Sequence, residues 1–191
     1  MAVDRRRWIL DAATKSFSLF GYKATTMDQV AKIANVGKGT IYTFFSTKED
    51  LFDEIMKQVI QEVKAAADRV IRPECSFLEN LQNALYEILE FRRNHELLIK
   101  LSHEIDDMGT PMAQEGMQKL EAAVLNFLRV KVQEAAERKD IKPCDPELTA
   151  FVMLKLYVSF VYDWEKNHPP LEKERIAELF RVYLFEGLAV T

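Results

Sequence analysis

Apolar residues recur at helical spacing along most of this sequence, and that periodicity limits the fold more than any other feature. From Leu51 to Val63 the apolar positions are one or three residues apart, which places them on one face of a helix. The 191 residues include only six glycines and six prolines, too few for the frequent turns of a β-sandwich or barrel. No segment alternates at the period of a strand. The sequence therefore predicts an all-α protein.

Capping and helix-breaking residues divide this pattern into separate helices. The first apolar stripe ends at Gly21, a residue suited to the left-handed position after a helix. Thr26 opens a capping box, and in the third helix we expect Ile41 and Phe44 to point inward. The expected helices cover about residues 8–20, 26–34, 38–45, 48–71, 77–93, 96–107, 111–138, 146–167 and 172–187.

Charge is distributed unevenly along the chain. Residues 1–48 contain eight Lys or Arg and three Asp, a net charge of +5, which leaves −9 for the remainder of a chain whose total is −4. A small basic module attached to an acidic body suggests that the first part meets a polyanion. We therefore expect a DNA-binding domain over residues 1–48 and a ligand-binding and dimerisation domain over residues 49–191.

Two short helices joined by a turn that contains glycine, between a preceding helix and a long following one, predict a helix-turn-helix. The second helix of that motif enters the major groove of DNA. Gly37 and Gly39 remove bulk, so the backbone of this helix can approach the duplex closely. Its polar residues Thr40, Tyr42 and Thr43 lie on the outward arc and can contact phosphate or base edges.

Flanking residues complete the predicted interface. Lys38 and Lys48 can reach phosphates, and Thr25 and Thr26 can bind phosphate through hydroxyl and N–H groups at a helix start. Taken singly, each residue also has an ordinary structural explanation as a cap, a turn residue or a half-buried aromatic. The candidate DNA contacts are Thr25, Thr26, Gly37, Lys38, Gly39, Thr40, Tyr42, Thr43 and Lys48.

The stretch TTMDQVAKIANVGKGTIYTFFSTKEDLF, residues 25–52, resembles the DNA-binding signature of the TetR family of bacterial transcriptional regulators. The resemblance implies an N-terminal three-helix DNA-binding domain, joined by a long helix to a C-terminal helical bundle that binds a ligand and dimerises. It also implies repression that a small molecule releases. Carried over by position, it implies operator contacts from Thr26, Lys38, Gly39, Thr40, Tyr42, Thr43 and Lys48.

The last two expected helices, 146–167 and 172–187, are apolar on nearly every side. Such a helix is either central to its own core or packs its second face on a partner. We expect a two-fold homodimer in which these helices form a four-helix bundle, as in proteins that this one resembles. A dimer would read a palindromic operator. The alternative is a monomer in which both helices are central.

An effector cavity is expected among helices 77–138 and 146–162. Its apolar lining favours a lipophilic effector, fatty acyl in type, although an ordinary core explains the same residues. Filling it would move the helix 48–71 and separate the two recognition helices. The candidate lining residues are Phe77, Leu81, Leu85, Leu98, Met112, Met117, Leu120, Val124, Phe127, Tyr157 and Phe160.

Catalytic and metal-dependent functions find little support in the sequence. The pair Glu165 and His168 matches only one half of a di-iron motif, and His95 and His103 are too far apart around a helix to share a metal. We expect no enzyme activity, no cofactor, no disulfide, no membrane segment and a cytoplasmic location. The alternative function is a helical ligand sensor without a defined operator.

Overall fold

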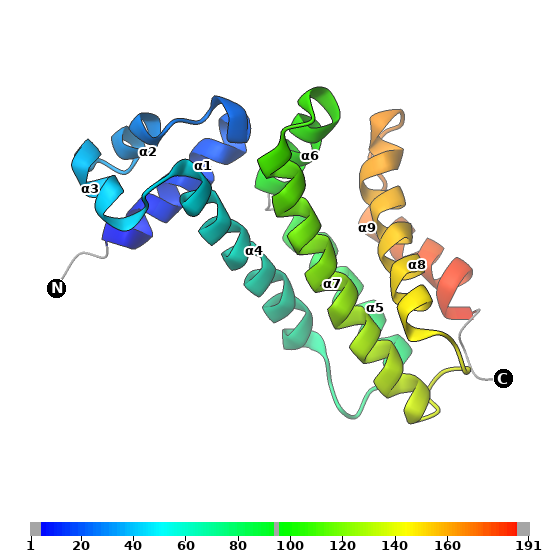
Figure 1. Ribbon diagram of the computed structural model, residues 1–191. Helices are drawn as coiled ribbons and strands as arrows, with labels where there is room; N and C mark the ends of the chain where they lie inside the picture. Colours follow the sequence, from blue (N-terminus) through cyan, green and yellow to red (C-terminus); the bar gives the residue numbers. More distant parts are fainter. Residues whose placement is uncertain (1–4, 94–95, 187–191) are drawn as a thin grey trace. The chain divides into compact units, whose positions relative to one another are not determined.

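The computed structural model describes residues 5–93 and 96–186 (Figure 1). All regular elements in this part of the chain are helical, which confirms the predicted all-α class. The α-helices are α1 (Arg5–Ala24), α2 (Met27–Ile33), α3 (Lys38–Phe44), α4 (Lys48–Val70), α5 (Phe77–Arg93), α6 (Glu96–Met108), α7 (Pro111–Glu137), α8 (Pro146–Val158) and α9 (Lys173–Phe180). Helix α8 continues as the π-helix η1 (Ser159–Asp163) and the 3-10 helix η2 (Trp164–Lys166), and α9 as the π-helix η3 (Arg181–Phe185).

Most predicted helix boundaries agree with the structure to within a few residues. The helical backbone is interrupted at Gly21, where the first helix was expected to end, at φ 82° and ψ 172°, and a further helical turn of α1 reaches Ala24. The helices predicted over 146–167 and 172–187 change their hydrogen-bonding pattern before they end, because each passes into a π-helical turn. Residue 187, the predicted end of the last helix, lies outside the described residues.

The chain divides into two compact units. The first contains the residues up to 62 together with 92–120, and the second contains 63–91 together with the residues from 121 onward. Helices α4 and α7 each begin in the first unit and end in the second. The first unit therefore includes α6 and the start of α7 besides the helix-turn-helix. The functional boundary predicted between residues 48 and 49 stays a prediction, since the packing units divide elsewhere.

In the first unit, α1 packs against α6 and α2, and α2 packs against α3 (Figure 1). Three aromatic rings meet in its core: the centroid of Phe52 lies 5.3 Å from that of Phe17 and 4.9 Å from that of Tyr22, both edge to face. Phe17 and Phe52 are fully buried. These rings join the first helix to α4, and burial of such side chains supplies about 1.5–3 kcal/mol each.

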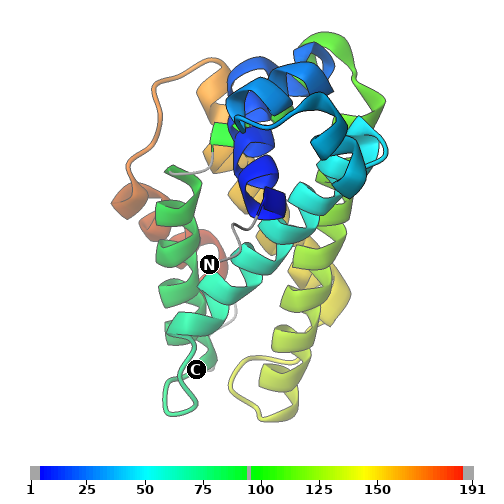
Figure 2. The same cartoon turned by 90° about the vertical axis from the view of Figure 1, so that its left-hand side faces the viewer.

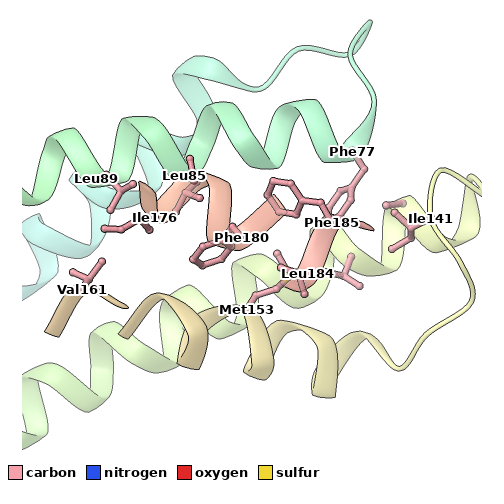
Figure 3. Packing of buried hydrophobic residues seen from close by; sticks show 13 residues of the cluster. Phe77, Leu85, Leu89, Ile141, Met153, Val161, Ile176, Phe180, Leu184 and Phe185 are labelled. Atoms are coloured by element: carbon pink, nitrogen blue, oxygen red, sulfur yellow. The ribbon is translucent and has the colours of Figure 1, made fainter. Parts of the chain in front are cut away.

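The second unit is built around apolar side chains from α5, α7, α8, α9 and η3 (Figure 3). Its fully or largely buried members include Phe77 and Leu85 of α5, Met153 of α8 and Phe180 of α9. Asp145 caps α8 by accepting hydrogen bonds from the N–H groups of residues 147 and 148. The α4–α5 and α7–α8 connections lie at the same end of this unit (Figure 2).

Cys75 and Cys144 are free thiols in the structure. Within residues 5–93 and 96–186, none of the helices combines the length and the apolar character that crossing a membrane requires.

The break in α1 generates a stability prediction. Gly21 has a positive φ of 82°, and a Cβ there would lie 2.1 Å from Oε2 of Glu104. We expect Gly21→Ala to lower the free energy of unfolding by about 2–4 kcal/mol, through backbone strain and overpacking. Gly39→Ala is the matched control, since a Cβ at Gly39 meets nothing within 4 Å. Denaturant titration of both variants measures the difference, and equal stabilities would contradict the prediction.

Candidate nucleic-acid interface

The helix-turn-helix consists of α2, a short connection and α3 (Figure 1). Thr26 caps α2 as the sequence predicts: its Oγ1 accepts the N–H of Gln29 at 3.2 Å, and its own N–H donates to Oε1 of Gln29 at 2.8 Å. In the connection, Asn35 takes the left-handed conformation, with φ 52°. Gly37 has φ −65° and ψ 147°, so Asn35 and not the glycine makes the reversal.

Helix α3 turns Ile41 inward, as predicted, but not Phe44. Ile41 is fully buried, whereas Phe44 is 43% exposed. Phe45 is 5% exposed and takes the expected place of Phe44 in the core. The physical reason is that the helix ends at Phe44. The backbone of Phe45 is extended, at φ −137°, and this directs the side chain of Phe45 inward. The sequence pattern could not distinguish these two adjacent phenylalanines.

The outer side of α3 carries the predicted polar contacts. Tyr42 and Thr43 are exposed and Thr40 is half-buried. The Thr43 hydroxyl donates to the Thr40 carbonyl at 2.6 Å, so its oxygen stays available to accept a bond. Lys38 lies at the start of the helix, with its Nζ 2.9 Å from a carboxylate oxygen of Asp28. That hydrogen bond, followed by the charge of Asp28, raises the pKa of the ammonium group. The pattern of the sequence did not indicate Asp28 as a partner of Lys38.

The two glycines at the start of α3 are not required by the fold. A Cβ at Gly37 would meet only Oγ1 of Thr40, at 3.7 Å, and a Cβ at Gly39 would meet nothing within 4 Å. Neither residue has a positive φ. Both are exposed. The surface of α3 therefore lacks side chains at two positions that could accommodate them.

Two predicted contacts are engaged within the protein. Thr25 is fully buried, and its hydroxyl lies 3.1 Å from that of Ser16, so this hydroxyl is engaged within the protein, and its contact with phosphate stays a prediction. The reason is that Thr25 faces α1, whereas Thr26 is exposed. Lys48 is half-buried, and its Nζ donates to the carbonyls of Tyr22, at 3.0 Å, and Thr25, at 3.1 Å. Its contact with DNA remains a prediction.

Tyr22 connects the end of α1 to the start of α4 through its hydroxyl group. The phenol donates to Oε1 of Glu49 at 2.6 Å. Burial, and then this hydrogen bond, raise the pKa of Tyr22 above its ordinary value of 10.0. The same hydrogen bond is the main cause that lowers the pKa of Glu49 below 4.5. Tyr22 therefore stays a neutral donor at physiological pH, and Glu49 stays an anionic acceptor.

The candidate lining residues are divided between the two units. Those of the second unit that pack into its apolar cluster are Phe77, Leu81, Leu85, Tyr157 and Phe160. Val124 and Phe127 of that unit are half-buried, as are Met112, Met117 and Leu120 of the first unit, where Leu98 is buried. Phe77 and Leu85 are buried core residues of the second unit, and Leu81, Tyr157 and Phe160 are partly buried and pack against that core. A role in ligand binding stays a prediction for the whole set.

Among the described residues, no three His, Cys, Asp or Glu side chains are grouped so that they could hold a metal ion. His168 stacks on the indole ring of Trp164, with centroids 3.9 Å apart. His95, which the sequence analysis considered together with His103, lies outside the described residues.

The packed three-helix arrangement, with an exposed polar helix that follows a capped one, defines a helix-turn-helix DNA-binding protein. A family model of bacterial regulatory proteins, the tetR family, matches residues 9–55. YhgD of Bacillus subtilis (strain 168), an uncharacterized HTH-type transcriptional regulator, is 55% identical over 189 residues, which cover 99% of each chain. The chain belongs to the TetR family: it is a DNA-binding transcriptional regulator and not an enzyme.

Solved structures share the fold over nearly the whole chain. The fatty acid degradation regulator FadR of Bacillus halodurans aligns with a TM-score of 0.74 at 18% identity and covers 94% of this chain and 95% of its own. AibR, in complex with isovaleryl coenzyme A and operator DNA, aligns with a TM-score of 0.68 at 24% identity and covers 95% of this chain and 98% of its own. At these identities the two comparisons establish a common fold.

The pair formed by Tyr22 and Glu49 generates a pH-dependent prediction. Tyr22→Phe removes the donor, and we expect the free energy of unfolding to fall by about 1 kcal/mol at pH 7, a value reduced for the exposure of Glu49. Because the pKa of Glu49 is lowered in the folded chain, its contribution is present above 4.5 and is lost as the pH falls through the folded value. Denaturant titrations over a series of pH values should therefore show the full difference between variant and wild type at pH 7, and a difference that decreases once the pH falls below 4.5.

Proposed function

We propose that this chain is a repressor that binds a palindromic operator as a two-fold homodimer and is released by a small lipophilic effector. The observation that carries the DNA-reading part is the exposed start of α3. Gly37 and Gly39 have room for a side chain and an unstrained backbone, so the fold does not explain why both lack one. Close approach to a DNA backbone explains it. A cytoplasmic location follows from access to DNA.

The remaining contacts fit this orientation of α3. Tyr42, 44% exposed, and Thr43 carry hydrogen-bonding groups that can reach phosphate or base edges. Lys38 and Asp28 form an exposed ion pair, which contributes little to stability and can exchange the carboxylate for a phosphate. Thr26 is exposed at the start of α2, and the family resemblance implies an operator contact from it. A sensor without an operator finds no support in the family assignment.

Support for the homodimer comes from a second apolar face on α8. Ala150, Met153 and Leu154 are buried in the second unit. Leu148, 61% exposed, Phe151 and Val152 lie on the opposite side, one helical turn apart. A helix with two apolar faces is accounted for when a partner covers the second. Exposed Val182 and Tyr183 of η3 extend the apolar surface of the region that we expect at the interface.

In the proposed dimer, two copies of α3 read half-sites about 34 Å or somewhat more apart. An effector acts only if it favours one spacing of the two copies over the other. Helix α4 follows the helix-turn-helix directly, so its displacement would change that spacing. Two structural neighbours support an acyl effector: one is named a fatty acid degradation regulator, and the other was solved with isovaleryl coenzyme A and operator DNA.

The DNA-reading proposal is tested at a position where the fold tolerates change. Gly39→Ala adds a methyl group into open space, so stability is expected to stay at the wild-type value or rise. Its affinity for a duplex that the wild-type chain selects from its source genome is expected to fall at least about tenfold, roughly 1.4 kcal/mol. Tyr42→Ala should cost about 1–3 kcal/mol of the same binding. Fluorescence anisotropy of the labelled duplex measures both losses.

Wild-type affinity of both variants would contradict the contact assignment.

The effector proposal is tested separately. Palmitoyl coenzyme A, titrated into the complex of the wild-type chain with the duplex, is expected to release the duplex, and free coenzyme A is the control. Release by neither compound would contradict an acyl effector and leave the DNA contacts unaffected.

The proposed interface is tested by placing a charge on it. Leu148→Asp is expected to weaken dimerisation at least about a hundredfold, because the carboxylate would lose water without a partner. Leu19→Asp is the matched control, since Leu19 is 53% exposed on α1 and belongs to the first packing unit, not to that of α8. Analytical ultracentrifugation measures the dissociation constants. A Leu148→Asp chain that sediments like wild type would place the interface elsewhere.

A further inference from the structure

The connection between α1 and α2 is held by side chains from two other helices of the first unit. Here it is taken as residues 22–26: the turn of α1 that follows the backbone break at Gly21, up to Ala24, and the two residues before the start of α2. Its last residue, Thr26, is the cap of α2, so the position of this connection determines where the helix-turn-helix begins.

The first of these side chains comes from the start of α4. Nζ of Lys48 donates to the carbonyls of Tyr22, at 3.0 Å, and Thr25, at 3.1 Å. It also lies 4.3 Å from the centroid of the Tyr22 ring, within the range of a cation–π contact. Two of the three ammonium protons are thereby directed at the protein backbone. A lysine that binds phosphate is expected to have its ammonium group in solvent or in an exposed ion pair, as Lys38 does with Asp28.

The second side chain comes from α6. Glu104 is 5% exposed, and its Oε1 accepts the backbone N–H of Lys23 at 3.0 Å. Its other oxygen occupies the space beside Gly21, where a Cβ would come within 2.1 Å of it. The glycine therefore admits the carboxylate to the backbone. An anion meets an N–H group and a cation meets two carbonyls, so the charge of each side chain matches the backbone group that it binds.

We propose that Lys48 and Glu104 are positioning residues: together they fix residues 22–25, and through them the capped start of α2, without touching DNA. The inference rests on operator binding by the helix-turn-helix. In this proposal Lys48 acts through the backbone of residues 22–25, and not through the phosphate contact that the family resemblance implies. The α1–α2 connection is the point at which α4 and α6 set the position of the motif.

Salt dependence distinguishes a positioning lysine from a phosphate contact. Each phosphate contact contributes about 0.9 to the slope of log affinity against log salt concentration. For the duplex selected by the wild-type chain, we expect Lys48→Met to weaken binding at least about tenfold with an unchanged slope. Lys38→Met is the matched control and is expected to reduce the slope by about 0.9. A reduced slope for Lys48→Met, or wild-type affinity, would overturn the proposal.

Glu104 is tested by a conservative pair of variants. Glu104→Gln keeps an oxygen acceptor for the N–H of Lys23 and should bind the duplex within about threefold of wild type. Glu104→Leu removes the acceptor and should lose at least about tenfold, with the wild-type salt slope. Equal affinities for the two variants would overturn the role of Glu104.

Amide hydrogen exchange tests the same residues without DNA. Exchange at Lys23 should accelerate at least about tenfold in Glu104→Leu but not in Glu104→Gln, and exchange over residues 22–26 should accelerate in Lys48→Met. Unchanged exchange in both Glu104→Leu and Lys48→Met would overturn the proposal. Because this measurement needs no operator, a chain that selects no duplex would contradict the proposed function, and the exchange rates would still decide the role of the two side chains.

Discussion

The helix-turn-helix of this protein depends on the packing of three aromatic rings. Phe17, Tyr22 and Phe52 meet edge to face or stacked, with centroids 4.9–5.8 Å apart, and they join the first helix to the fourth. Two short helices cannot bury enough apolar surface to be stable alone. The rings provide the fixed support on which α2 and α3 pack, and the polar bonds of Tyr22 and Lys48 then set the position of the connection between α1 and α2.

Polar groups in the first packing unit serve two different purposes, and the degree of burial distinguishes the two kinds of group. Around the α1–α2 connection, Thr25 and Glu104 are buried, and their hydrogen bonds satisfy other groups of the protein. On α3, Lys38 and Tyr42 are exposed, and the Lys38 ammonium forms an ion pair with Asp28, which is also exposed. An exposed ion pair costs little to break, so it leaves the cation available for a phosphate.

Local patterns predicted much of this arrangement because their causes are local. The Thr26 capping box and the cap of α8 involve residues two or three apart, and the prolines at 111 and 146 stand at the first positions of α7 and α8. The choice between Phe44 and Phe45 as the core residue could not be predicted. It depends on whether α3 ends at Phe44 or one residue later, and the packing of the core decides where the helix ends.

The sequence by itself determined the all-α class, the position of the helix-turn-helix and the polar outer side of α3, because helical periodicity, caps and turns act over a few residues. Only the tertiary structure decided that Thr25 faces inward, that Lys48 binds two carbonyls and that Glu104 reaches the break at Gly21. Lys23 and Glu104 are 81 residues apart in the chain. No local pattern encodes a contact over that separation, since it exists only after α1 and α6 have packed together.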